Sequence, residues 1–188
     1  MIPDTYKLAF NSQRISEEVA RMGQEITPWA KKVQLKSGKD VIGMPILRGG
    51  IFFFADLVRA IDFSVEVTPV RTWAYRGSGS SAELKNEVKV NMDGVNVEGR
   101  SVLLIDDICD SGSTLTELTK QLKSQGVSEV KTAVLIRREL TTPSFEPEYI
   151  GFEYSGIEWF VGYGMEDQER WRNLRDVYTI EGSGKHVV

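Results

Sequence analysis

Three acids and three hydroxyls cluster where one apolar segment of this chain ends. The run Val102–Ile105 is followed by Asp106 and Asp107, then by Asp110, and then by the stretch Ser111–Thr114. This stretch precedes a region with helical apolar spacing, and the first N–H groups of a helix have no partner within it. Those groups and the helix dipole favour a bound anion. The run therefore suits a phosphate monoester.

The residue types in this stretch fit the same chemistry. Gly112 permits a close approach of the backbone to a ligand, and Ser111, Ser113 and Thr114 add hydrogen-bond donors. The neighbouring acids would repel a phosphate, so they match sugar hydroxyls or a divalent cation better. A sugar-phosphate site is the hypothesis. The alternative is that one residue caps a helix and the adjacent acids lie at the surface.

Composition excludes several other kinds of site. The 188-residue chain has one cysteine, Cys109, and one histidine, His186, which rules out an intrachain disulfide, a His-based zinc site and a Ser-His or Cys-His pair. We expect Cys109 to be an inert small residue. A net charge of -4 argues against a dedicated nucleic-acid binder. With no long apolar segment, we predict a cytoplasmic protein without a membrane partner.

The elements that must position these residues follow from periodicity. Helical spacing begins at Ile15 and is expected to end near Gly23 and Pro28. Further helices are expected over 51–61 and 115–126. Strands are expected over 41–46, 65–73, 102–105 and 130–136, with a hairpin around Asp93-Gly94.

This alternation predicts an α/β fold, with an open, mainly parallel twisted sheet flanked by helices. We expect residues 1–188 to form one domain. Its core would span about 30–140. A small hood would comprise about 143–188 plus the N-terminal segment. In such sheets ligands bind at the carboxyl ends of the strands, where the acidic run lies.

The segment from Val102 to Leu115 resembles the phosphoribosyl diphosphate (PRPP) signature of type I phosphoribosyltransferases. Three other segments, Pro45–Leu57, Trp159–Met165 and Arg172–Leu174, resemble those of hypoxanthine-guanine phosphoribosyltransferases. The resemblance implies that fold, PRPP, a purine base and pyrophosphate as partners, Mg²⁺ as cofactor, and a homodimer or homotetramer. It also implies transfer of the phosphoribosyl group to hypoxanthine or guanine in purine salvage.

The resemblance assigns the PRPP side of the site. Asp110 would be the general base and, with Ser111–Thr114, would meet the 5′-phosphate, while Asp106 and Asp107 would bind the ribose and the metal. The pyrophosphate would meet Arg48, Gly49 and Arg172, with a peptide that can be cis between Leu47 and Arg48. The alternatives are that Gly49 and Gly50 only start a helix and that Arg172 pairs with a nearby acid.

The resemblance also assigns the base side and a mobile lid. The purine would contact Arg137, Trp159, Phe160, Val161 and Glu166, and either Glu166 or Asp167 would bind the metal. Ala74 and Tyr75 replace the family's Ser-Tyr pair in the lid. The alternatives are a solvated basic pair at 137–138 and a core aromatic at 159.

Two other functions stay open from the sequence alone. Arginine stands where the family has lysine at two positions, so a xanthine-preferring or other-base phosphoribosyltransferase is one alternative. A nucleotide-sensing, RNA-binding regulator of the same fold is the other, which the acidic net charge disfavours.

Overall fold

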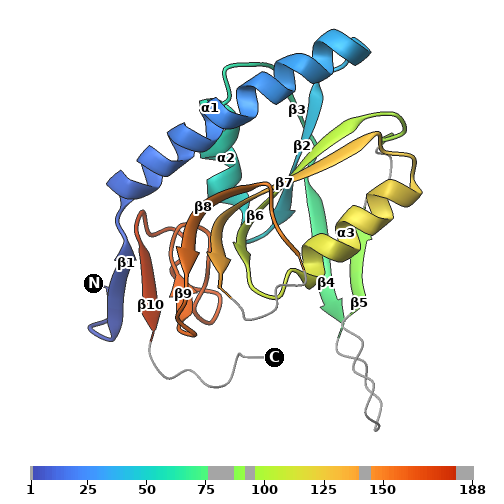
Figure 1. Ribbon diagram of the computed structural model, residues 1–188. Helices are drawn as coiled ribbons and strands as arrows, with labels where there is room; N and C mark the ends of the chain where they lie inside the picture. The colour runs from blue at the N-terminus through green and yellow to red at the C-terminus, as the bar shows by residue number, and fades with distance from the viewer. Residues whose placement is uncertain (1, 76–86, 92–95, 140–144, 181–188) are drawn as a thin grey trace, which may run out of the picture.

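The computed structural model describes residues 2–75, 87–91, 96–139 and 145–180. Its larger sheet has the strand order β5-β4-β2-β6-β7-β8, with β3 also paired to β2 (Figure 1). The strands are β2 (Val41–Leu47), β3 (Val65–Val67), β4 (Val70–Tyr75), β5 (Glu87–Asn91), β6 (Ser101–Cys109), β7 (Glu129–Arg138) and β8 (Tyr149–Tyr154). Strands β4, β2, β6, β7 and β8 run parallel, and β5 is antiparallel to β4. The prediction of an open, mainly parallel sheet is confirmed.

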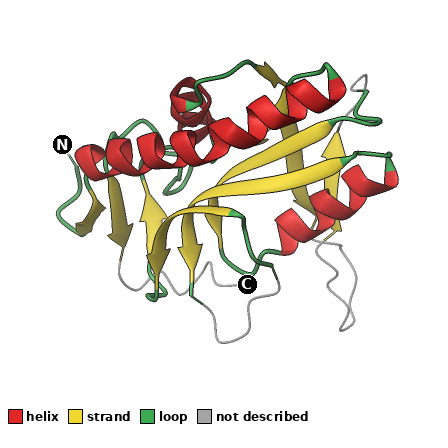
Figure 2. Cartoon of the chain, turned by 45° about the horizontal axis from the view of Figure 1, so that its top comes forward, coloured by secondary structure: helices red, strands yellow, loops and turns green. Residues whose placement is uncertain are grey.

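Helices cover both faces of this sheet. Helices α1 (Ser12–Ser37) and α2 (Ile51–Ala60) pack on one face, where the core includes Met22, Phe53 and Leu103. Helix α3 (Ser113–Ser124) packs on the other, where Leu118 and Leu104 are buried. Figure 2 shows the sheet between α1 and α3. Each large apolar side chain that is fully buried contributes about 1.5–3 kcal/mol, and the two cores thereby fix the strand ends that carry the site.

Helix α1 is longer than the sequence predicted. Pro28 lies inside it, buried side chains continue to Val33, and the helix ends at Gly38, which has a left-handed φ of 70°. The prediction that Gly23 and Pro28 end the helix was wrong because packing outweighs one missing N–H. Gly23 serves a different purpose: a Cβ there would overlap the backbone of Ala60, so glycine lets α1 approach α2 closely.

Two strands replace the single strand expected over 65–73. Both β3 and β4 pair with β2, and the Thr68 N–H donates to the Gly43 carbonyl at 3.0 Å between them. Pro69 has no N–H to continue the ladder, which accounts for the interruption. Residues 88–90 of the expected hairpin lie in β5, which pairs with β4, whereas Asp93 and Gly94 lie outside the described residues.

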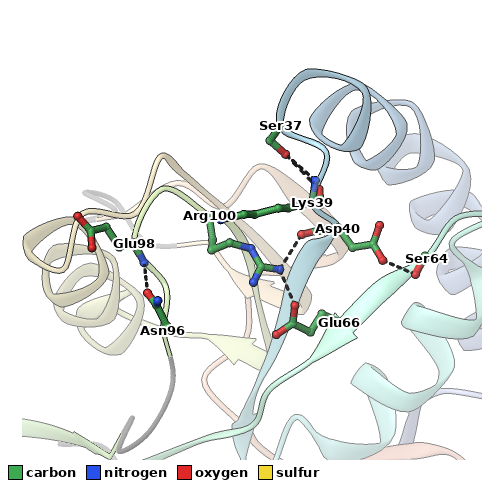
Figure 3. Close-up of polar contacts among 8 residues, drawn as sticks. All are labelled: Ser37, Lys39, Asp40, Ser64, Glu66, Asn96, Glu98 and Arg100. Carbon is green, nitrogen blue, oxygen red and sulfur yellow. Dashed lines mark hydrogen bonds and ion pairs between the residues drawn. The ribbon is translucent and has the colours of Figure 1, made fainter.

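Arg100 joins three strands at the edge opposite to the predicted site. Its guanidinium donates to the Asp40 carbonyl at 3.0 Å and pairs with Glu66 of β3 at 2.5 Å (Figure 3). Asp40 also accepts a 2.6 Å hydrogen bond from the Ser64 hydroxyl. These contacts hold the starts of β2, β3 and β6 together.

A second, three-stranded antiparallel sheet has the order β1-β10-β9 and forms the hood (Figure 1). Its strands are β1 (Tyr6–Phe10), β9 (Trp159–Val161) and β10 (Val177–Ile180). Phe10 stacks on Phe152 of β8 at 4.1 Å between ring centroids, which anchors the hood to the larger sheet. Strand β8 itself lies in the larger sheet, so this sheet extends beyond the residue 140 expected for the core. In the part of the chain that the structure describes, no helix is long and apolar enough to cross a membrane.

Cys109 ends β6 with 3% of its surface exposed, and burial raises the pKa of its thiol to about 11. At about pH 8 only about 0.1% of such a thiol is thiolate, the reactive form. We expect iodoacetamide to leave the folded protein unmodified and to label it once in denaturant, as read by intact mass. Rapid labelling of the folded protein would contradict the expectation that Cys109 is inert.

Candidate active site

A cavity of about 640 Å³ lies at the carboxyl ends of β2, β6 and β7 and against the hood. This is the position at which open α/β sheets bind ligands. Many of the residues singled out from the sequence line it: Arg48, Gly49, Asp106, Asp107, Asp110, Thr114, Trp159, Phe160, Glu166 and Arg172. The hood therefore closes one side of the site, and the strand ends form its floor.

Asp106 and Asp107 are buried at the end of β6, with 8% and 9% of their surface exposed. The Asp107 N–H donates to Asp106 Oδ1 at 3.0 Å. Burial raises the pKa of both carboxyls, and the charge of Asp107 raises the pKa of Asp106 further. Gly49 lies so close that a Cβ there would overlap the Asp107 carboxylate, so a side chain at this position would displace that carboxylate.

These carboxylates fit a magnesium ion that is held partly by substrate. Two adjacent buried carboxylates are unfavourable without a compensating cation. Mg²⁺ usually binds through one or two carboxylates together with waters and substrate phosphates. Within the described ranges, no three His, Cys, Asp or Glu side chains gather into a complete ligand set.

The loop after β6 has the geometry of an anion site. Helix α3 begins at Ser113, and the residue before it, Gly112, is buried with a left-handed φ of 77° and no side chain to cap the helix. A Cβ on Gly112 would overlap Phe145, so both its backbone conformation and its surroundings require glycine. The hydroxyls of Ser111 and Ser113 lie 3.1 Å apart on the exposed side. Thr114 lines the cavity itself.

Asp110 forms an ion pair across the cavity. Its Oδ1 accepts a 2.6 Å hydrogen bond from Nε of Arg138, which ends β7. Two further groups of Arg138 donate to the Gly156 and Glu158 carbonyls, and its side chain is only 13% exposed. The guanidinium is thus fixed in place and orients the carboxylate of Asp110.

The structure places Arg138 in the cavity lining, and Arg137, to which the resemblance assigned the purine contact, lies outside it. Adjacent residues of a strand point to opposite faces, and Arg137 pairs in register with Cys109. Its guanidinium pairs with Glu146 and, at 2.5 Å, with Glu153. Sequence alone showed two arginines at a strand end without showing which one faces the ligand.

The hood contributes an aromatic wall. Trp159 and Phe160 line the cavity, and the Trp159 indole N–H donates to the Glu166 carbonyl at 2.6 Å. Val161 is fully buried, and its backbone pairs with β10, so its side chain is part of the core. Of the two candidate metal carboxylates, Glu166 lines the cavity, whereas Asp167 accepts a 2.6 Å hydrogen bond from the Tyr6 hydroxyl of β1.

Two arginines also line the cavity: Arg48 follows β2, and Arg172 lies between β9 and β10. The Leu47–Arg48 peptide bond is cis, as the resemblance implies. Arg172 donates to the Gly164 carbonyl at 2.8 Å, and both Arg48 and Arg172 form ion pairs with Glu169. The lid positions, 74 and 75, end β4 and pair with β5, and the loop 76–86 lies outside the described residues.

Comparison with known proteins decides the family. Residues 16–168 match the family described as the phosphoribosyl transferase domain. A hypoxanthine-guanine phosphoribosyltransferase from Aquifex aeolicus is 32% identical over 177 residues, which cover 93% of this chain and 94% of that protein. The chain belongs to the hypoxanthine-guanine phosphoribosyltransferase family. The protein of that name from Mycobacterium tuberculosis is 27% identical over 179 residues, covering 95% of this phosphoribosyltransferase and 87% of the relative.

The fold of this phosphoribosyltransferase also matches solved structures. A crystal structure of a hypoxanthine phosphoribosyltransferase from Staphylococcus aureus superposes with a TM-score of 0.79 at 28% identity. The match covers 93% of this chain and 91% of that one, so it includes the hood as well as the larger sheet. The prediction of a type I phosphoribosyltransferase fold is confirmed.

Proposed function

We propose that this enzyme transfers the 5-phosphoribosyl group from PRPP to hypoxanthine or guanine, giving the nucleotide and pyrophosphate in purine salvage. One observation carries the proposal: a single cavity joins buried acids, a helix start, two arginines and an aromatic wall. The buried acids would bind the ribose, and the helix start would bind the 5′-phosphate. The two arginines would bind the pyrophosphate, and the aromatic wall would bind the base. The similarity to hypoxanthine-guanine phosphoribosyltransferases supports the same acceptors.

On the base side, Trp159 offers a π-face for stacking and Arg138 offers donors for the 6-oxo group. Asp110 accepts a proton from a purine ring nitrogen while the purine attacks C1′ of the ribose. The new bond joins a purine nitrogen to C1′, and the bond between C1′ and the pyrophosphate oxygen breaks. Arg138 keeps the Asp110 carboxylate aimed at the base during this step.

On the PRPP side, Ser111–Thr114 and the start of α3 hold the 5′-phosphate, and Asp106 and Asp107 hold the ribose hydroxyls and balance positive charge on the sugar. Arg48 and Arg172 take up charge on the leaving pyrophosphate. A bound Mg²⁺ would be held either by Asp106 and Asp107 or by Glu166, in each case together with the substrate's oxygens, and it would neutralise charge on the pyrophosphate. The hood excludes water that would otherwise hydrolyse the activated sugar.

Four further expectations complete this proposal: the cofactor, the assembly, the location and the absence of a nucleic-acid partner. We propose Mg²⁺ as the cofactor and a homodimer or homotetramer as the assembly. The cytoplasmic location stays a prediction, as does the absence of a nucleic-acid partner, which the net charge of -4 supports.

A base panel tests the proposed function. The enzyme is given PRPP and Mg²⁺ with hypoxanthine, guanine, xanthine and adenine in turn, and nucleotide formation is followed by its absorbance. We expect turnover with hypoxanthine or guanine and at least a hundredfold lower kcat/KM with adenine, because the Arg138 guanidinium has no acceptor to offer a 6-amino group. A preference for xanthine would show that xanthine is the acceptor in place of hypoxanthine or guanine. No turnover with any base would refute the function.

A further inference from the structure

Glu169 occupies the point at which the two proposed pyrophosphate arginines converge. Its Oε1 lies 2.6 Å from Arg48 Nη2, and its Oε2 lies 3.5 Å from Arg172 Nη2. Each carboxylate oxygen therefore faces a different guanidinium. A carboxylate held in this way resembles one end of the polyanion that the same arginines are proposed to bind.

The backbone presents Glu169 at the tip of a tight turn. The N–H groups and carbonyls of Asp167 and Arg170 bond to each other at 3.0 and 3.1 Å, and the two residues between them, Gln168 and Glu169, have φ of 51° and 63°. A turn with two left-handed central residues favours Asn-Gly, not two long side chains. A poor local choice of residue in a well-formed turn is expected where the side chain has a function.

The two ion pairs of Glu169 lie at the surface of the protein. Its side chain is 61% exposed, and the side chains of Arg48 and Arg172 are 64% and 24% exposed. Exposed ion pairs are weak and exchange readily, so a bound polyanion can displace this carboxylate.

We propose that Glu169 is a displaceable counter-charge for the pyrophosphate subsite. It is a positioning residue: it holds Arg48 and Arg172 together in the empty enzyme and competes with pyrophosphate for them. This competition lowers the affinity of the enzyme for the product pyrophosphate and so speeds its release. This inference rests on the proposed function, because it uses the same two arginines.

The test measures binding of magnesium pyrophosphate by calorimetry, without turnover, in the wild type, Glu169→Gln and Glu169→Gly. Both substitutions remove the competing charge, and the glycine also suits the left-handed φ. We expect pyrophosphate to bind both variants about three- to tenfold more tightly, with the gain shrinking at high salt. Steady-state kinetics with excess base should show a lower KM for PRPP.

Glu153→Gln is the matched control. It removes one charge from a glutamate that also pairs with an arginine, but that arginine, Arg137, lies outside the cavity lining. Its pyrophosphate affinity should match the wild type. A similar gain in this control would overturn the inference, since it would show a general effect of net charge.

Unchanged or weaker pyrophosphate binding in Glu169→Gln and Glu169→Gly would also overturn the inference. Weaker binding would mean that Glu169 supports the arginines without competing for them. Thermal unfolding separates this from damage to the fold: the glycine variant should melt no lower than the wild type. The base panel reports on the proposed function separately, because it depends on product formation and the calorimetry does not.

Discussion

The Asp110→Asn substitution is expected to lower kcat by about 10²- to 10⁴-fold, the usual range for loss of a general base. The amide oxygen can still accept the hydrogen bond that Arg138 donates to Asp110, so the geometry of the pair is retained. The amide cannot take up a proton at neutral pH. Single-turnover experiments with saturating PRPP and base would measure the loss at the chemical step.

A second substitution distinguishes chemistry from binding. Ser113→Ala removes a hydroxyl at the start of α3, and we expect it to raise the KM for PRPP several-fold with little change in kcat. If Ser113→Ala instead lowered kcat and Asp110→Asn raised only the KM for PRPP, the roles assigned to the two residues would be exchanged. If Asp110→Asn retained turnover within about threefold of the wild type, the role of Asp110 as general base would be refuted.

Asp106→Asn is expected to make the ligand-free enzyme more stable and at least tenfold less active. Burial raises the pKa of the Asp106 carboxyl, so the folded protein binds its proton more tightly than the unfolded chain does. The stability from this group is therefore fully present below about pH 4 and is lost as the pH rises through the raised pKa. Near neutral pH, the uncharged amide removes a destabilising buried charge.

The gain should be about 1–3 kcal/mol, or about 2–12 °C in Tm for a chain of this size. Thermal unfolding with EDTA at about pH 8 and about pH 5 would measure it, with the larger difference at the higher pH. Asp62→Asn is the control, because its side chain is 94% exposed and its removal should change Tm by about 1 °C or less. A lower Tm for Asp106→Asn at the higher pH would contradict the expected effect of burial.

Much of the larger sheet could be predicted because its patterns are local. The apolar run before Asp106 became the buried strand β6, and the small residues after Asp110 became the start of α3. The rule that ligands bind at carboxyl ends of strands then located the cavity. Resemblance supplied what periodicity lacks, including the cis peptide before Arg48 and the aromatic wall at Trp159.

The features that the sequence did not predict depend on contacts between residues that lie far apart in the chain. Helix α1 continues past Pro28 because side chains beyond it pack on the sheet, which no local signal records. The choice between Arg137 and Arg138 depends on the direction of two adjacent side chains in β7, and a paired partner, Asp110, lies 28 residues away. Arg137 pairs in register with the buried Cys109, and this register exists only once β6 and β7 have paired.

Strand β1 lies beside β10 although some 170 residues separate their paired positions, for example Tyr6 and Ile180. Because translation proceeds from the N-terminus, a nascent chain on the ribosome can assemble β2 and β6 well before β1 meets its partner. Contacts so far apart in sequence also form slowly. The Tyr6 hydroxyl reaches Asp167 beside Glu166, so competence to recognise the base should arise late in biosynthesis, after the acids at the end of β6 and the start of α3 are already in place.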